Sequence, residues 1–107
     1  MGFESPKTMQ DFQQAVIAHG DKPVFCKFSA DFCGPCQLIA ADLEKLSEEF
    51  SDKMGFIYVD VEALEDVAQA FSVENLPTFI ILKNLNPVGQ EYGTKIDKVR
   101  ELVEKVL

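Results

Sequence analysis

Apolar residues recur every three or four positions in four stretches of this chain, a spacing that places them on one face of a helix. In the first stretch, Thr8 is suited to cap the helix and Gly20 to end it. In the second, charged residues fill the opposite face. The four predicted helices are residues 8–19, about 16 residues that begin near Cys33, residues 62–72, and a final helix from about residue 94 or 95.

Short, nearly continuous apolar runs alternate with these helices and predict strands that are buried on both faces. The predicted strands are residues 24–30, 54–61 and 79–82, followed by a turn at residues 83–87 and a partner strand at residues 88–92. The first strand contains one charged residue, Lys27. Because a helix connects the first two strands, these strands are expected to be parallel, with a right-handed crossover.

Length, charge and cysteine usage restrict the possible functions. A chain of 107 residues is expected to form one domain, residues 1–107. Its net charge of −8 argues against nucleic acid or an anionic membrane as the main partner. The sequence shows no signal-peptide pattern or apolar run of membrane-spanning length, and its three cysteines do not suggest the disulfide framework of a secreted protein. We therefore expect a cytoplasmic protein in a reducing compartment.

The sequence Cys33-Gly34-Pro35-Cys36 stands where the first strand becomes the second helix. Thiols at this spacing can close a disulfide across the first turn of the helix, and the positive end of the helix dipole favours a thiolate. Cys33 is therefore the candidate nucleophile, and Cys36 is placed to resolve the disulfide that Cys33 forms. Gly34 keeps the turn small, and Pro35 restricts the backbone and removes one amide donor, so both are expected to tune the redox properties.

A Cys-x-x-Cys pair alone would also fit half of a zinc site, which needs four ligands. The chain offers only Cys26 and His19 in addition. Cys26 lies within an apolar run and is expected to be buried and unreactive, while His19 is expected to be a solvated residue near a helix C-terminus. We therefore expect no metal site.

Several motifs together resemble the thioredoxin family, in the family's order and over essentially the whole chain from about residue 8. The motifs are Cys33-Gly34-Pro35-Cys36 after the first strand, Asp60-Val61-Glu62 after the second, Leu76-Pro77-Thr78 before the third, and Gly93 before the last helix. The resemblance implies an α/β, thioredoxin-like fold with a central mixed β-sheet flanked on both faces by about four helices. It also implies a thiol–disulfide oxidoreductase that reduces protein disulfides through a reversible Cys33–Cys36 disulfide and needs no bound cofactor.

The resemblance further implies partners and a binding surface. The expected partners are disulfide-containing target proteins and an NADPH-dependent thioredoxin reductase, with the chain itself a monomer. Pro77 is implied to be a cis proline that faces the cysteines and leaves nearby backbone groups free to pair with a substrate. Phe32, Leu76 and Gly93 would complete the docking surface, whereas Tyr92 is interpreted as a core or strand-edge residue.

The chain departs from the family pattern mainly behind the cysteines. Lys27 stands where thioredoxins carry a buried aspartate, and Tyr58 where a lysine is common; Ser29 and Phe32 replace two tryptophans. Lys27 could stabilise a thiolate or act as a base, or its stem could simply fill space while the ammonium reaches water or Tyr58. Lys27 and Tyr58 are therefore expected to tune the redox behaviour of the two cysteines. The departures also leave open a second function, a catalytically weakened thioredoxin-like binding module or redox sensor.

Overall fold

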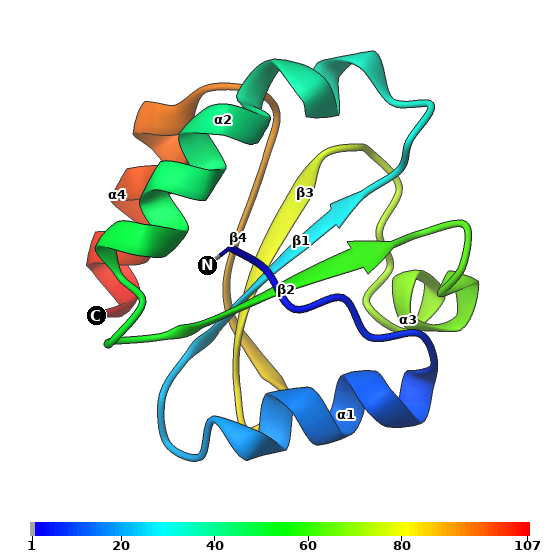
Figure 1. The fold of residues 1–107 in the computed structure, drawn as a ribbon, viewed down its shortest axis with the longest axis vertical. Coiled ribbons are helices and arrows are strands. Elements are labelled where there is room, and N and C mark those ends of the chain that lie inside the picture. The colour runs from blue at the N-terminus through cyan, green and yellow to red at the C-terminus, as the bar shows by residue number, and fades with distance from the viewer. Residues whose placement is uncertain (1) are drawn as a thin grey trace.

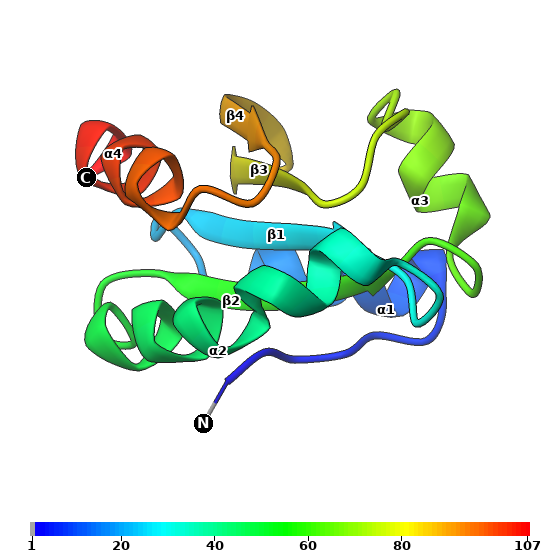
Figure 2. The ribbon, with the colours of Figure 1, turned by 90° about the horizontal axis from the view of Figure 1, so that it is seen from above.

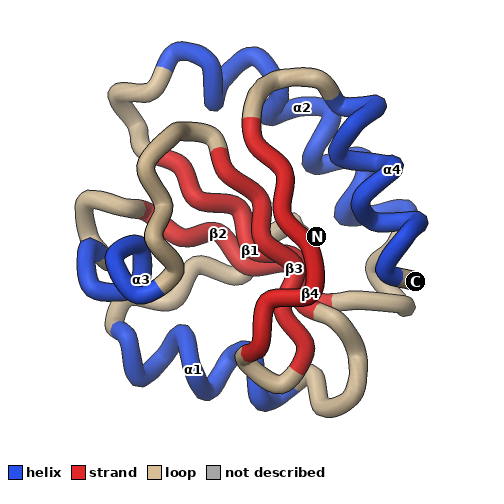
Figure 3. The backbone as a smooth tube through the Cα atoms, turned by 180° about the vertical axis from the view of Figure 1, so that it is seen from behind, coloured by secondary structure: helices blue, strands red, loops and turns tan. Residues whose placement is uncertain are grey.

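The computed structural model describes residues 2–107, which form a four-stranded sheet with helices on both faces (Figures 1 and 2). The strands are β1 (Val24–Ser29), β2 (Gly55–Asp60), β3 (Thr78–Lys83) and β4 (Asn86–Tyr92), in the spatial order β2-β1-β3-β4. β1 pairs parallel with β2 and antiparallel with β3, and β4 lies antiparallel to β3 at one edge (Figure 3). The predicted mixed sheet and the parallel β1–β2 pair are confirmed.

Alternation along β1 assigns the two faces of the sheet to two pairs of helices. The helices are α1 (Met9–Ala18), α2 (Gly34–Glu49), α3 (Glu65–Ala70) and α4 (Ile96–Val106). Phe25 packs in a core with residues of α2 and α4, whereas its neighbour Cys26 packs in a second core with residues of α1 and α3. Lys27, two residues after Phe25, therefore projects from the face that α2 covers.

Two predicted boundaries differ from the structure. The helix expected at residues 62–72 spans only Glu65–Ala70, since the Asp60 side chain accepts a hydrogen bond from the Glu62 amide at 3.0 Å and forms a turn there instead. The turn expected at residues 83–87 is shorter, because β4 already begins at Asn86. Its central residues, Asn84 and Leu85, have φ angles of 52° and 68°, as a two-residue hairpin turn requires.

The N-terminal segment, residues 2–6, lies along β2 and was not predicted from the sequence. The Glu4 amide donates to the Phe56 carbonyl at 2.9 Å, and the Glu4 carbonyl accepts from the Tyr58 amide at 2.7 Å. His19 does not stand free in solvent as expected, because its Nε2 lies 2.8 Å from Glu4 Oε2. The Phe3 ring packs against that of Phe56. Within residues 2–107, no helix combines the length and hydrophobicity that crossing a bilayer requires.

Candidate active site

The two cysteines of the motif lie at the start of α2, directly after β1, as predicted. Cys33 is the N-cap residue of α2, and Pro35 occupies its first turn. A disulfide joins Cys33 to Cys36, whose Cα atoms are 5.3 Å apart. The Cys36 amide also donates a hydrogen bond to Cys33 Sγ at 3.2 Å. After reduction, this amide and the helix dipole would favour negative charge on the Cys33 sulfur.

Both cysteines of the disulfide are buried. The exposed fraction of the residue is 7% for Cys33 and 5% for Cys36. Ala30, Val61 and Leu76 pack against the pair. The chemical difference between the two cysteines therefore comes from their positions in the helix rather than from their exposure in the disulfide form.

The loop before β3 lies beside the disulfide. The Leu76–Pro77 peptide bond is cis, as the family resemblance implied. The Gly93 amide donates to the Pro77 carbonyl at 3.1 Å, which connects this loop to the end of β4. Three of the four residues expected to bind substrate, Leu76, Pro77 and Gly93, are thus connected to one another, and Leu76 contacts the disulfide.

Two aromatic side chains at this end of the molecule are exposed. Phe32, directly before Cys33, is 70% exposed, in agreement with its expected position at a loop tip. Tyr92 is 64% exposed and lies in the edge strand β4, so of its two interpretations the core position is wrong and the strand-edge position is confirmed. β4 is an edge strand, and Tyr92 lies on its open face together with Val88 and Gln90. The alternation of positions along residues 88–92 is the sequence feature that corresponds to this exposed face.

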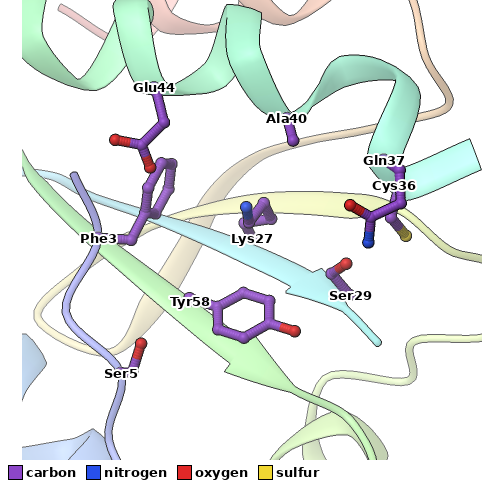
Figure 4. A pocket seen from close by; sticks show the side chains of 9 residues that line it. All are labelled: Phe3, Ser5, Lys27, Ser29, Cys36, Gln37, Ala40, Glu44 and Tyr58. Carbon is purple, nitrogen blue, oxygen red and sulfur yellow. The ribbon is translucent and has the colours of Figure 1, made fainter. Parts of the chain in front are cut away.

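A pocket of about 230 Å³ lies behind Cys36, between α2, the ends of β1 and β2, and the N-terminal segment (Figure 4). Lys27 and Tyr58, which sit opposite each other in the β1–β2 register, both line it. Cys36 and Glu44 enter from α2, and Phe3 from the N-terminal segment. We call this the Lys27 pocket. The structure thus brings Lys27 and Tyr58 into one pocket with Cys36, together with Phe3 and Glu44, which no sequence motif indicated.

The Lys27 side chain is half-buried and lies between two aromatic rings. Its Nζ is 4.8 Å from the centre of the Phe3 ring and 5.0 Å from that of Tyr58. Burial lowers the pKa of Lys27, and the nearby Glu44 carboxylate acts in the opposite direction. Burial also raises the pKa of Tyr58, with smaller contributions from nearby carboxylates, of which Asp60 is the largest. The contacts therefore fit the interpretation that the Lys27 stem fills space while its ammonium reaches Tyr58.

The remaining sequence predictions concern Cys26 and metal binding. Cys26 is fully buried, and burial raises the pKa of its thiol well above the ordinary value, as expected for an unreactive thiol. Within residues 2–107, no three His, Cys, Asp or Glu side chains are grouped so that they could hold a metal ion.

Comparison with known proteins gives a consistent result. The family model for thioredoxin matches residues 5–106. Human thioredoxin is 38% identical over 96 residues, which are 90% of this chain and 90% of that protein. Thioredoxin-T of Drosophila melanogaster is 36% identical over 99 residues, 92% of this chain, but the match spans only 63% of that longer protein. The crystal structure of reduced Schistosoma mansoni thioredoxin pre-protein superposes with a TM-score of 0.92 at 34% identity, covering all of both chains.

Proposed function

The chain belongs to the thioredoxin family and is a thiol–disulfide oxidoreductase, and on that premise we propose that Cys33 is its attacking thiol and Cys36 its resolving thiol. Proteins of this family generally act on disulfide-containing targets. The observation that carries the assignment is the hydrogen bond from the Cys36 amide to Cys33 Sγ at the N-terminus of α2. Cys36 lies inside the helix and receives no comparable hydrogen bond among the described residues.

The proposed reaction has two steps. The Cys33 thiolate attacks one sulfur of a target disulfide, the target S–S bond breaks, and a mixed disulfide forms while the other target sulfur leaves as a thiolate and takes up a proton. The Cys36 thiol then loses its proton, and its thiolate attacks Cys33 Sγ. The Cys33–Cys36 bond forms, and the second target sulfur leaves. Two electrons pass from the protein dithiol to the target.

The two residues between the cysteines support a reducing role. Gly34 has open space where a side chain would start, and Pro35 lies in the first turn of α2, where its missing amide removes a donor that could stabilise a thiolate. We propose that both residues tune the reduction potential of the Cys33–Cys36 pair, Gly34 by keeping the turn small and Pro35 by lacking this donor.

We propose a target-binding surface around the disulfide. Its members are Phe32, Leu76, Pro77 and Gly93, the last three connected as described above. Phe32 provides an exposed aromatic side chain next to the nucleophile, the kind of residue that often contributes strongly to binding. An extended target segment that carries the disulfide would lie between Phe32 and the loop before β3.

Further proposals concern the domain, its reductase, its oligomeric state and its location. Residues 1–107 act as one thioredoxin-like domain, which the family match over residues 5–106 supports. The oxidised protein is returned to the dithiol by an NADPH-dependent thioredoxin reductase, and the protein works as a monomer. We also propose a cytoplasmic location, because the three cysteines comprise one redox pair and one buried thiol, a pattern suited to a reducing compartment.

Insulin reduction tests this function. With dithiothreitol as electron donor, the wild-type protein is expected to accelerate insulin reduction, and a Cys33→Ser variant is expected to lose the acceleration. With NADPH and a thioredoxin reductase in place of dithiothreitol, NADPH should be consumed. No acceleration with either donor would instead favour the binding-module or sensor function, and acceleration with dithiothreitol alone would refute the proposed reductase partner.

A further inference from the structure

We propose that Lys27 is a positioning residue for the resolving step, and that its ammonium group stabilises the thiolate of Cys36 across the Lys27 pocket. This inference rests on the proposed function, because it assigns a role within the Cys33–Cys36 reaction. It concerns the second sulfur to react, whereas the helix N-terminus acts mainly on the first.

The position of Lys27 in β1 places its side chain on the face of the sheet that α2 covers. Phe25 and Lys27 alternate with Cys26 along the strand, and Phe25 packs in the core beneath α2 and α4. Lys27 is thus on the α2 side, where it lines the same pocket as Cys36 (Figure 4). A cation in the centre of a sheet is costly unless a feature of the structure compensates for its burial. The contacts of Lys27 show how this cation is held.

Lys27 is stabilised by aromatic rings rather than by an ion pair. Residues 2–107 contain two ion pairs, His19–Glu4 and Arg100–Glu49, and neither includes Lys27. Its Nζ lies over the ring faces of Phe3 and Tyr58, at 4.8 and 5.0 Å from their centres. Cation–π contacts with these rings favour the ammonium form, against the burial that lowers the pKa of Lys27, and the charge of the ammonium acts on the other groups that line the pocket.

Burial and the acidic groups around the pocket oppose a thiolate on Cys36. Cys36 is 5% exposed, so ionisation takes place with little help from solvent. Glu44 enters the pocket from α2, and the Tyr58 ring enters from β2. The carboxylates that act on the Tyr58 hydroxyl are those of Asp60, Asp31 and Glu62. Among the described residues that line the pocket, Lys27 is the only cation, and it offsets these effects.

The charge acts at one defined point of the reaction. In the mixed disulfide, the Cys36 thiol gives its proton to water, and the resulting thiolate attacks Cys33 Sγ as the Cys33–target bond breaks. The rate at neutral pH is proportional to the fraction of Cys36 that is ionised, and a nearby ammonium raises this fraction. At an effective dielectric constant of about 20 and with solvent screening, a unit charge that shares a small pocket with a thiol shifts the thiol pKa by roughly one unit.

The test measures the Cys36 thiol directly in a Cys33→Ser background, where Cys36 is the reactive thiol and Cys26 is buried. The pH dependence of iodoacetamide alkylation gives its pKa. Lys27→Met and Lys27→Gln are expected to raise this pKa by roughly one unit, and Lys27→Arg, which keeps the charge, is expected to leave it near its starting value. Lys53→Met removes the same charge from an exposed turn and should have no effect.

Glu44→Gln is expected to have the opposite effect, because loss of the carboxylate should lower the Cys36 pKa. In the dithiol protein, Lys27→Met should slow insulin reduction roughly threefold at pH 7, because the smaller thiolate fraction is partly offset by the higher nucleophilicity of a less acidic thiolate, and the rate should recover at higher pH. An unchanged Cys36 pKa in Lys27→Met and Lys27→Gln would overturn the proposal. So would a pKa raised equally by Lys27→Arg, because the effect would then not depend on charge. The alkylation readout needs no turnover, so the result is distinct from a failure of the proposed reductase function.

Discussion

Reduction of the Cys33–Cys36 disulfide is expected to destabilise the folded protein by a modest, calculable amount. The bond closes a very short loop, because its cysteines are separated by 3 positions in the sequence. In the chain-entropy model, a cross-link of this length removes about 6 cal/mol/K from the unfolded ensemble, or about 2 kcal/mol at 25 °C. Longer loops would give more, so this value is at the low end for natural disulfides.

The same quantity can be expressed as a melting temperature. Unfolding entropy is about 2.1 cal/mol/K per residue near 60 °C. For a chain of 107 residues, a loss of about 2 kcal/mol therefore lowers the midpoint by about 8 °C. The oxidised protein is expected to melt at the higher temperature.

The assay is calorimetric or optical melting at pH 6, with and without tris(2-carboxyethyl)phosphine. Both thiols of the unfolded chain remain protonated at this pH, so thiolate formation does not complicate the comparison. A Cys33→Ser, Cys36→Ser double variant is the control, and its midpoint should not respond to the reductant. A reduced protein that melts at the same temperature as the oxidised one, or higher, would refute the reasoning.

Two further predictions concern groups outside the redox centre. Hydrogen bonds from the Arg100 guanidinium at 2.8 and 2.9 Å hold the pKa of the Glu49 carboxyl below its ordinary value of 4.5. The stability that this pair contributes is therefore fully present above pH 4.5. It is lost as the pH falls through the lowered pKa of Glu49. Carboxyl NMR titration should show Glu49 moving up toward the ordinary value in Arg100→Gln, and no movement would contradict the pairing. The buried Cys26 thiol is expected to resist iodoacetamide in the folded, oxidised protein and to react once the chain is denatured, as measured by intact mass. Rapid labelling of Cys26 in the folded protein would show that the thiol is accessible.

The elements and the redox pair could be predicted because local signals determine them. A nearly continuous apolar run predicted β1, and apolar residues at helical spacing predicted α2. The junction between these two elements placed Cys33 at a helix N-terminus. The cis Leu76–Pro77 peptide bond followed from the family pattern, not from any local rule. These features depend on residues close together in the sequence or on a motif of known geometry.

The features that sequence reasoning missed depend on where distant segments meet. Residues 2–6 have no periodic pattern, and their pairing with β2 becomes visible only when the edge of the sheet is known. The choice between a core and a strand-edge position for Tyr92 required the strand order, which puts β4 at an edge of the sheet. The setting of Lys27 is formed by Phe3, Glu44 and Tyr58, which come from three other segments. The sequence identified Lys27 as unusual but could not specify its neighbours.

The central claim, that Cys33 attacks and Cys36 resolves, is tested most directly by trapping the mixed disulfide. Reduced Cys36→Ser protein is mixed with a disulfide-containing target protein, the reaction is quenched with acid, and the covalent adduct is mapped by peptide mass spectrometry without reduction. The Cys36→Ser variant is expected to accumulate an adduct through Cys33, while Cys33→Ser accumulates almost none because Cys36 lies inside α2 and Cys26 is fully buried. Efficient trapping of the target on Cys36 in the Cys33→Ser variant, with little on Cys33 in the other, would contradict the assignment.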